Sequence, residues 1–323
     1  MRYPRDKPRG GDVRVIEAAD VHRVLEFPGL IDALRVTFAG SASMPRRMVF
    51  PLDEGRSSDA FALLPAWTAE VIGVKAFTYL PGNAAKGREI LHSKILLFDR
   101  ESGRPLDLMD GTSVTYWRTA AVAALAADYL ARSDATRLLV CGTGHLAPFM
   151  ALANASVRPV QEVGIWGRNR DKAARVVEDL RRRRPDLRFH VIQDLEAAAR
   201  RADMISCATG SRDPLIFGAW VQPGTHVGLF GNHDRDGREC DTPLVEKSKI
   251  YVDSRANVLN EAGEILIPIA EGRFREEEIV AELSELCSGG KPARANNDEI
   301  TLFKSVGTAL SDLAAARLVA KRQ

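Results

Sequence analysis

Residues 137–170 read RLLVCGTGHLAPFMALANASVRPVQEVGIWGRNR, and this stretch decides the fold. A short apolar run, Leu138 to Cys141, leads through a glycine turn into a helix-compatible segment, and a second apolar run ends at Trp166. This order predicts a strand, a helix and a second parallel strand. Gly142 suits a tight turn, and Gly144 leaves the backbone open at the helix start, where N–H groups and the helix dipole favour an anionic phosphate.

The turn is therefore a candidate dinucleotide-binding site, with Ala147 in the third small position of the G-x-G-x-x-G/A pattern. A purely structural turn is the alternative, because glycine-rich turns are common between strands and helices. The ring of His145 is expected to face solvent or the cofactor. The residues of this turn predicted to bind cofactor are Gly142, Thr143, Gly144, His145 and Leu146.

The end of the second strand indicates which dinucleotide is bound. An NAD site usually has an acidic residue there for the ribose 2′-hydroxyl, whereas an NADP site has arginine and small polar groups for the 2′-phosphate. Here Arg168 and Asn169 follow Gly167, and no carboxylate precedes Asp171. The sequence thus favours NADP(H) over NAD(H), with a solvated basic loop as the alternative interpretation.

Strand-like and helical segments keep alternating after this unit, which predicts a Rossmann-type doubly wound parallel sheet. Such sheets bind ligands at the carboxyl ends of their strands, where Thr209 and the triplet Gly231 to His233 are expected. The last segment, Leu302 to Val319, is Ala-rich and predicted to be helical. The six expected strands are Leu138–Cys141, Val163–Trp166, Phe189–Ile192, Met204–Ala208, His226–Phe230 and Ile250–Asp253.

The first third differs, with alternating apolar patterns typical of a mixed sheet and one or two helices. A long helix is predicted from Thr112, and Arg118 lies near its start among small apolar residues. A buried arginine needs a partner, so Arg118 either pairs with a local carboxylate or awaits an anionic ligand. The expected domains are a loose tail at 1–12, an α+β domain at 13–116 plus 302–323, and the dinucleotide domain at 117–301.

Composition excludes several classes of protein. The net charge is only +2 and the arginine clusters are dispersed, so no nucleic-acid partner is expected. No apolar run is long enough to span a bilayer, and no signal-peptide pattern is present. The four cysteines form no metal-binding spacing, so we expect no metal site, and free thiols fit a cytoplasmic location.

Ten short motifs occur in one order along the chain, and together they are specific. They are MPRRMVFPL, LLPAW, GVK, MDGTSVTYWRTAAVAAL, CGTGHLA, IWGRN, PLIFGAWVQPGTHVGLFG, RECD, YVDS and TLFKSVGTAL. From about residue 13 to its C-terminal helix, the chain resembles the ornithine cyclodeaminase/mu-crystallin family in these motifs. IWGRN, FGAWVQPG, YVDS and LFKS look closest to the mu-crystallin branch, which is associated with NADPH-dependent ketimine reduction.

The resemblance implies a homodimer in which the first third and the last helix form the substrate-binding and dimerisation domain. It also implies that Arg47, Lys75 and Arg118 converge on the α-carboxylate of a small amino or imino acid. Arginine and lysine suit this task, because they bind a carboxylate as a fork and as a compact charge. Thr115 and Thr209 are expected to reach the phosphates or nicotinamide of the cofactor.

Simpler interpretations of the cations stay open. Either Arg46 or Arg47 can be solvated, since neighbours in an extended segment face opposite ways, and Arg47 is chosen on the resemblance alone. Lys75 is either a strand-end charge, a carboxylate ligand, or a proton donor to an imine.

One position departs from the family pattern. Ornithine cyclodeaminases have an Asp two residues after the glycine that corresponds to Gly231, whereas this chain has His233 there. An imidazole exchanges protons near neutral pH, so His233 is a candidate acid. The leading hypothesis is an NAD(P)H-dependent reductase of imines or ketimines with an α-carboxylate. The alternatives are NAD-dependent cyclodeamination of ornithine to proline and ammonia, and a non-catalytic protein that binds NADPH and a small ligand.

Overall fold

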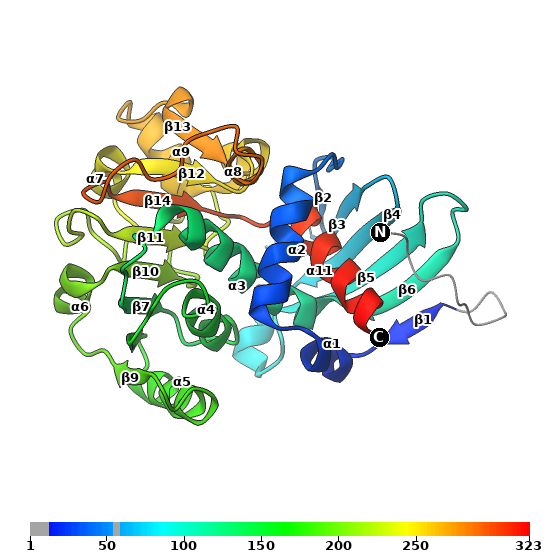
Figure 1. The fold of residues 1–323 in the computed structure, drawn as a ribbon, viewed down its shortest axis with the longest axis horizontal. Helices are drawn as coiled ribbons and strands as arrows, with labels where there is room; N and C mark the ends of the chain where they lie inside the picture. The colour runs from blue at the N-terminus through cyan, green and yellow to red at the C-terminus, as the bar shows by residue number, and fades with distance from the viewer. Residues whose placement is uncertain (1–12, 54–58) are drawn as a thin grey trace. The chain divides into compact units, whose positions relative to one another are not determined.

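A computed structural model describes residues 13–53 and 59–323 of the chain. The chain divides into two compact units (Figure 1). Unit 1 comprises Met1–Arg118 and Thr308–Gln323, and unit 2 comprises Thr119–Gly307. The predicted loose tail at 1–12 lies outside the described residues.

Unit 2 is built on an eight-stranded sheet in the order β13-β12-β14-β11-β10-β7-β8-β9, and every neighbouring pair is parallel (Figure 1). This confirms the predicted Rossmann-type doubly wound sheet. The strands are β7 Arg137–Cys141, β8 Glu162–Trp166, β9 Arg188–Val191, β10 Met204–Cys207, β11 His226–Leu229, β12 Lys249–Val252, β13 Ile279–Glu282 and β14 Thr301–Lys304. The helices are α4 Leu146–Asn154, α5 Arg170–Arg183, α6 Leu195–Arg201, α7 Thr242–Lys247, α8 Arg255–Glu261, α9 Gly263–Ala270 and α10 Leu283–Cys287, with a 3-10 turn η2 at Glu276–Glu278.

The predicted helix from Leu302 to Val319 was wrong in its first part. Thr301–Lys304 is strand β14, which is fully buried between β11 and β12. Gly307 then takes a positive φ of 84°, and the Thr308 side chain accepts a hydrogen bond from the Ser311 N–H, so the helix α11 begins only at Ala309. A strand covered on both faces has no alternating apolar pattern, so the sequence of Thr301–Lys304 does not distinguish this strand from the helix that follows it.

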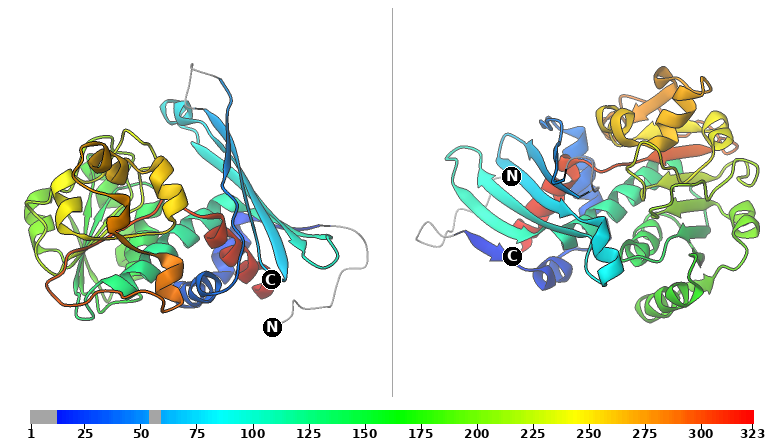
Figure 2. Two further views of the ribbon diagram at one scale, coloured as in Figure 1. Left: turned by 90° about the horizontal axis from the view of Figure 1, so that it is seen from above. Right: turned by 180° about the vertical axis from the view of Figure 1, so that it is seen from behind.

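Unit 1 contains a six-stranded sheet in the order β1-β6-β5-β4-β3-β2, antiparallel except for the β1–β6 pair. Helix α11 packs on β3, β4 and β5, and α2 packs beside α11 on the same side of the sheet (Figure 2). The strands are β1 Arg14–Ile16, β2 Met48–Pro51, β3 Ala60–Trp67, β4 Val71–Tyr79, β5 Leu91–Asp99 and β6 Pro105–Asp110. The helices are α1 Ala18–Val24, α2 Phe27–Ala39, α3 Gly111–Leu130 and α11 Ala309–Arg322, with a 3-10 turn η1 at Pro81–Lys86.

Close packing fixes the elements that carry the cations of unit 1. A Cβ at Gly73 of β4 would lie 2.7 Å from Leu313 Cδ1, so glycine lets α11 approach the sheet. Helix α3 begins in unit 1 at Gly111, directly after β6, and its residue 119 is the first of unit 2. This packing sets Lys75 of β4, Arg118 of α3 and residues of α11 around one buried point.

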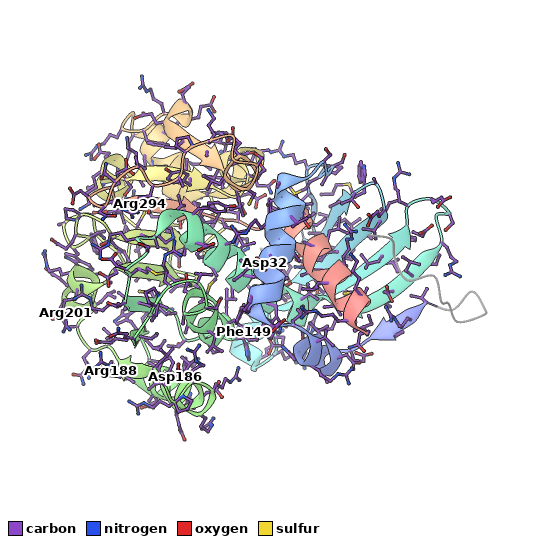
Figure 3. The ribbon with its side chains drawn as sticks, in the orientation of Figure 1. Asp32, Phe149, Asp186, Arg188, Arg201 and Arg294 are labelled. Carbon is purple, nitrogen blue, oxygen red and sulfur yellow. The ribbon has the colours of Figure 1, made fainter. Side chains whose placement is uncertain are left out.

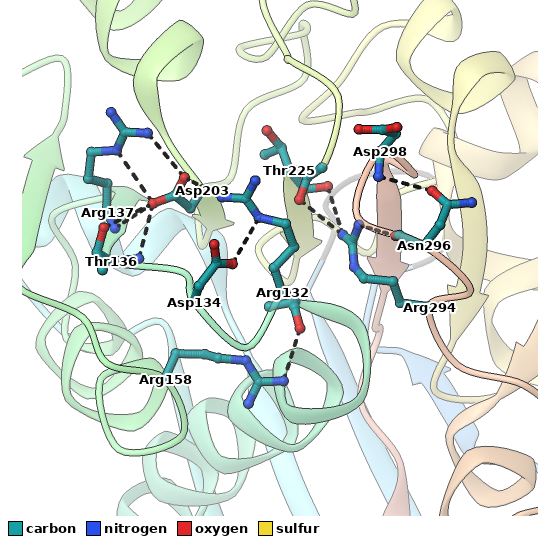
Figure 4. Close-up of polar contacts among 12 residues, drawn as sticks. Arg132, Asp134, Thr136, Arg137, Arg158, Asp203, Thr225, Arg294, Asn296 and Asp298 are labelled. Carbon is teal, nitrogen blue, oxygen red and sulfur yellow. Dashed lines mark hydrogen bonds and ion pairs between the residues drawn. The ribbon is translucent and has the colours of Figure 1, made fainter.

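Asp203 holds together the amino ends of β7 and β10 in unit 2. Asp203, just before β10, accepts hydrogen bonds from the backbone N–H groups of Thr136 and Arg137 and from the Arg132 side chain (Figure 4). At the sheet's edge, Asp186 pairs with Arg184. Figure 3 labels Asp186 and Arg188, the first residue of β9. These charges have structural partners, so the carboxyl ends of the strands are the better place to look for a ligand site.

Among the residues that the structure describes, no helix combines the length and the apolar character that a membrane span requires.

Candidate functional site

The glycine turn after β7 has the backbone geometry that a phosphate site requires. Gly142 has a φ of 135°, and a Cβ there would lie 2.6 Å from the Ala208 carbonyl oxygen. A Cβ on Gly144 would meet no atom within 4 Å, so that side of the turn opens to a ligand. Helix α4 begins immediately afterwards, and the exposed His145 at its N-cap makes no side-chain capping hydrogen bond. The first N–H groups of α4 are thus oriented as anion donors.

A cavity of about 260 Å³ lies over this turn, at the carboxyl ends of β7, β8 and β10. Its lining includes five of the residues predicted to bind cofactor: Gly142, Thr143, Gly144, Arg168 and Thr209. Leu146 is the first residue of α4, next to His145. The Asn169 side chain caps α5 by accepting a hydrogen bond from the Lys172 N–H at 2.9 Å, so the amide oxygen has a structural partner.

Arg168 is exposed at the rim of this cavity, directly after β8. A Cβ on the preceding Gly167 would lie 2.4 Å from Thr143 Cγ2, so glycine lets the end of β8 come close to the phosphate turn. The guanidinium therefore follows the second strand at the position where dinucleotide folds recognise the adenosine ribose.

Glu239 joins two of the loops at the strand ends, a role that the sequence analysis did not predict. Its Oε1 accepts hydrogen bonds from Thr209 N at 2.7 Å and Thr209 Oγ1 at 2.8 Å, and its Oε2 accepts one from Gly231 N at 2.9 Å. The side chain is fully buried, and burial is the main cause that raises its pKa. The sequence signal for this residue was its place in the RECD motif, in which Glu239 is the second residue.

A second buried group holds the loop that carries His233. Lys304 Nζ lies 2.6 Å from the Asn232 carbonyl oxygen and 2.9 Å from Glu264 Oε2, and Lys304 and Glu264 are both fully buried. The Asn232 amide in turn donates to the Ser211 carbonyl at 2.6 Å. The Asn232 side chain is thus committed to the loop, whereas His233 is exposed beside it.

Unit 1 contains a cluster of cations around one carboxylate. Asp312 Oδ1 accepts hydrogen bonds from Arg118 Nε at 2.9 Å and Lys75 Nζ at 3.3 Å. Arg47 is close enough to lower the pKa of Lys75, while the neighbouring Arg46 is exposed. The structure thus brings the three predicted carboxylate ligands to one region of unit 1. Arg118 thus has a carboxylate partner, which comes from the distant helix α11, and its predicted contact with an anionic ligand stays a prediction.

Lys75 is only 3% exposed, and its pKa is lowered to about 8. Burial is the main cause, and the charges of Arg118 and Arg47 act in the same direction, while Asp312 raises the pKa. Because that pKa lies near neutrality, Lys75 can gain or lose a proton under ordinary conditions.

Thr115 lies in this cluster as well. Its Oγ1 accepts a hydrogen bond from Lys75 Nζ at 2.5 Å and donates one to the Gly111 carbonyl at 2.7 Å. The hydroxyl thus has partners in the cationic cluster, and the predicted contact with cofactor stays a prediction. Sequence reasoning missed Asp312, although a lone carboxylate in an Ala-rich helix was a usable signal.

His226 of β11 has a structural role. It is buried, its Nδ1 lies 2.9 Å from Thr301 Oγ1, and burial lowers its pKa to about 3. Within residues 13–53 and 59–323, no group of three or more His, Cys, Asp or Glu side chains is arranged to hold a metal ion.

Comparison with known proteins finds relatives that match along most of the chain. The chain is 47% identical over 313 residues to a Delta(1)-pyrroline-2-carboxylate reductase of Colwellia psychrerythraea, covering 96% of this chain and 99% of that one. It is 33% identical over 282 residues to the ketimine reductase mu-crystallin of Rattus norvegicus, covering 87% and 85%.

A solved structure gives the same result at the level of fold. The Delta(1)-pyrroline-2-carboxylate reductase of Thermococcus litoralis, in complex with NADH and L-proline, superposes with a TM-score of 0.92 at 32% identity, covering 96% of this chain and 97% of that one. The model of the ornithine cyclodeaminase/mu-crystallin family matches residues 13–323. The chain therefore belongs to the ornithine cyclodeaminase/mu-crystallin family.

Proposed function

We propose that this protein is an NAD(P)H-dependent reductase that converts a cyclic imine with an α-carboxylate into the corresponding cyclic amino acid. The observation that carries the proposal is the cluster in which Lys75 and Arg118 share one oxygen of Asp312 beside Arg47. Relatives named pyrroline-2-carboxylate reductase and ketimine reductase support the reaction class. Five- and six-membered ring imines are accordingly the first substrates to test.

The residues of unit 2 fit a nicotinamide dinucleotide. Gly142 and Gly144 would place the backbone N–H groups of the turn and of α4 against its pyrophosphate, because a side chain at Gly142 would clash and Gly144 faces open space. When bound in reduced form, the cofactor supplies a hydride. We propose that Arg168 pairs with a 2′-phosphate and that NADPH is therefore preferred to NADH.

The cations of unit 1 would bind and orient the substrate. Thr115 and Asp312 take two of the three N–H donors of Lys75, so one donor is left for a ligand among the described contacts. Arg118 and Arg47 add positive charge, and a carboxylate held by several cations fixes the neighbouring carbon.

The imine nitrogen needs a proton when the carbon is reduced, because a protonated imine is the better hydride acceptor. Lys75 is protonated below its pKa of about 8, so at neutral pH it can donate that proton as well as attract the carboxylate. His233 is the second candidate donor, from the exposed part of the loop after β11.

We also propose that the protein is a homodimer, formed through the outer face of the sheet in unit 1. That face carries half-buried apolar side chains on adjacent strands, and the edge strand β2 adds Met48 and Phe50, which are 46% and 47% exposed. A large apolar patch of this kind is typical of a protein interface. Its central residues are Leu63, Pro65, Ile72, Val74, Leu96, Phe98 and Leu108. The cytoplasmic location expected from the free cysteines stays a prediction.

The proposed reaction is tested by following NADPH oxidation with Δ1-pyrroline-2-carboxylate and its six-membered homologue. We expect turnover by the wild type and a loss of about 100-fold or more in kcat/KM for Lys75→Ala, since a buried charge that binds the ligand is removed. Lys321→Ala is the matched control, because Lys321 is an exposed lysine in the last turn of α11 in the same unit. No turnover of any imine, together with release of ammonia and proline from ornithine with NAD, would instead establish cyclodeamination. Tight NADPH binding without either reaction would indicate a binding protein.

A further inference from the structure

Among the residues that the structure describes, Asp312 is the carboxylate that contacts the cationic cluster of unit 1, and its two oxygens differ. Oδ1 is shared by Arg118 Nε and Lys75 Nζ, whereas Oδ2 is buried and has no hydrogen-bond partner among the described residues. The side chain is 1% exposed, so a substrate does not reach it directly. A carboxylate buried with an unsatisfied oxygen is costly, and such a cost is expected where a charge has a function.

The groups around Lys75 show which positive charges the Asp312 carboxylate faces. From α3, Arg118 and the neutral hydroxyl of Thr115 face the ammonium, and Asp312 faces it from α11. Arg47 acts on it from the segment before β2, and the Phe77 ring on its own strand has its centroid 5.7 Å from Nζ. Among the described contacts, Lys75 and Arg118 therefore share one oxygen of a single carboxylate, so the positive charge of this pair exceeds the negative charge that it faces.

We propose that Asp312 is a positioning residue for imine reduction: it aligns the Lys75 ammonium with the Arg118 guanidinium and keeps Lys75 protonated for the substrate. This inference rests on the proposed function. One oxygen accepting from two cations fixes their separation, and a substrate carboxylate can then bind both without rearrangement.

The negative charge of Asp312 also acts on the pKa of Lys75, in the direction opposite to burial and the neighbouring arginines. Burial, Arg118 and Arg47 lower the pKa of Lys75, and Asp312 is the carboxylate that raises it. Without that carboxylate Lys75 would lose its proton at a lower pH, and the clamp would lose charge in the neutral range. Activity would then fall on the alkaline side sooner than in the wild type.

The test compares Asp312→Asn with the wild type. Asparagine keeps an oxygen acceptor of nearly the same shape and removes only the charge. The alkaline limb of the kcat/KM profile should move to lower pH by about one pH unit or more. The loss of kcat/KM relative to the wild type should then be about tenfold greater at pH 8.5 than at pH 6. Asp107→Asn is the matched control: Asp107 is also buried in unit 1 but pairs with Arg14 of β1, so its variant should keep the wild-type limb.

A second readout does not depend on activity. The pKa of Lys75 is measured in the protein without substrate, from the NMR shifts of ¹³C-labelled lysine, with Lys75→Arg to assign the signal. A lower pKa of Lys75 in Asp312→Asn than in the wild type supports the inference, even if no imine is turned over. In that case the proposed reaction is wrong, but the role of Asp312 toward Lys75 stands. An unchanged pKa and an unchanged alkaline limb in a folded Asp312→Asn overturn it.

Loss of Asp312 leaves two buried cations without their carboxylate, so the single variant is at risk of not folding. The same comparison is then made in an Arg118→Gln background, where one of those cations is gone. Adding Asp312→Asn to Arg118→Gln should still lower the pKa of Lys75, since Lys75 and Asp312 also contact each other directly. Equal Lys75 pKa values in Arg118→Gln and in the double variant Arg118→Gln/Asp312→Asn would refute the inference.

Discussion

Arg168 is the residue on which the proposed cofactor preference depends. It stands at the end of β8, at the rim of the cavity over the glycine turn, and no carboxylate occupies its place. Arg168→Ala should lower kcat/KM for NADPH by about 10- to 100-fold and change that for NADH little, because a guanidinium–phosphate pair is lost in one case only. The measurement is the ratio of the two kcat/KM values at fixed ionic strength.

Arg170→Ala serves as the control for this ratio. Arg170 is also exposed and begins α5, but it does not line the cavity. An equal loss with both cofactors in Arg168→Ala, or the same change of ratio in Arg170→Ala, would show that the 2′-phosphate is recognised elsewhere.

At the scale of elements, Glu239 holds the ends of β10 and β11 together. A Cβ on Gly231 would lie 2.0 Å from Thr209 N, so the two loops touch, and Glu239 accepts hydrogen bonds from both. In Glu239→Gln an amide N–H₂ replaces one acceptor oxygen, which leaves a buried N–H without a partner. We expect a loss of about 1–3 kcal/mol in the free energy of unfolding, measured by urea denaturation.

The same substitution should weaken binding of NADPH several-fold, because Thr209 lines the cavity over the glycine turn, where we propose that the cofactor binds. Cofactor fluorescence measures that affinity. Glu196→Gln is the control, since Glu196 is an exposed residue of α6 paired with Arg200. Unchanged stability and affinity in Glu239→Gln would mean that the loops are held by their backbone alone.

Local patterns made the parts around the glycine turn predictable. Gly142 marks a backbone conformation that other residues avoid, and the strands on either side are continuous apolar runs, so the fold class and most of the residues that line the cavity over the turn could be predicted from the sequence. The strand Thr301–Lys304 did not, because a four-residue buried strand beside an Ala-rich run carries no distinct period. The partner of Lys75 was hidden for another reason: Asp312 lies 237 positions away, and no local pattern reports a contact of that range.

At the scale of the whole molecule, the proposed dimer should depend on the apolar outer face of the sheet in unit 1. Phe50→Glu places a charge on the exposed edge strand β2, where Phe50 stacks on Phe61, and should convert the dimer to a monomer in light scattering coupled to size exclusion. Val36→Glu is the control, because Val36 is 73% exposed on α2. A monomeric wild type, or a Phe50→Glu protein that stays dimeric, would argue against this interface.

Unit 1 is proposed to recognise the α-carboxylate of an imine that is reduced with a nicotinamide cofactor. The most direct measurement is NADPH oxidation with two ring imines that differ only in that group, Δ1-pyrroline-2-carboxylate and 1-pyrroline. We predict that the carboxylate-bearing imine is turned over and that kcat/KM for 1-pyrroline is lower by about 100-fold or more, because the buried cations would lack a counter-charge. Equal kcat/KM values for the two imines would show that the cations of unit 1 do not recognise the substrate carboxylate.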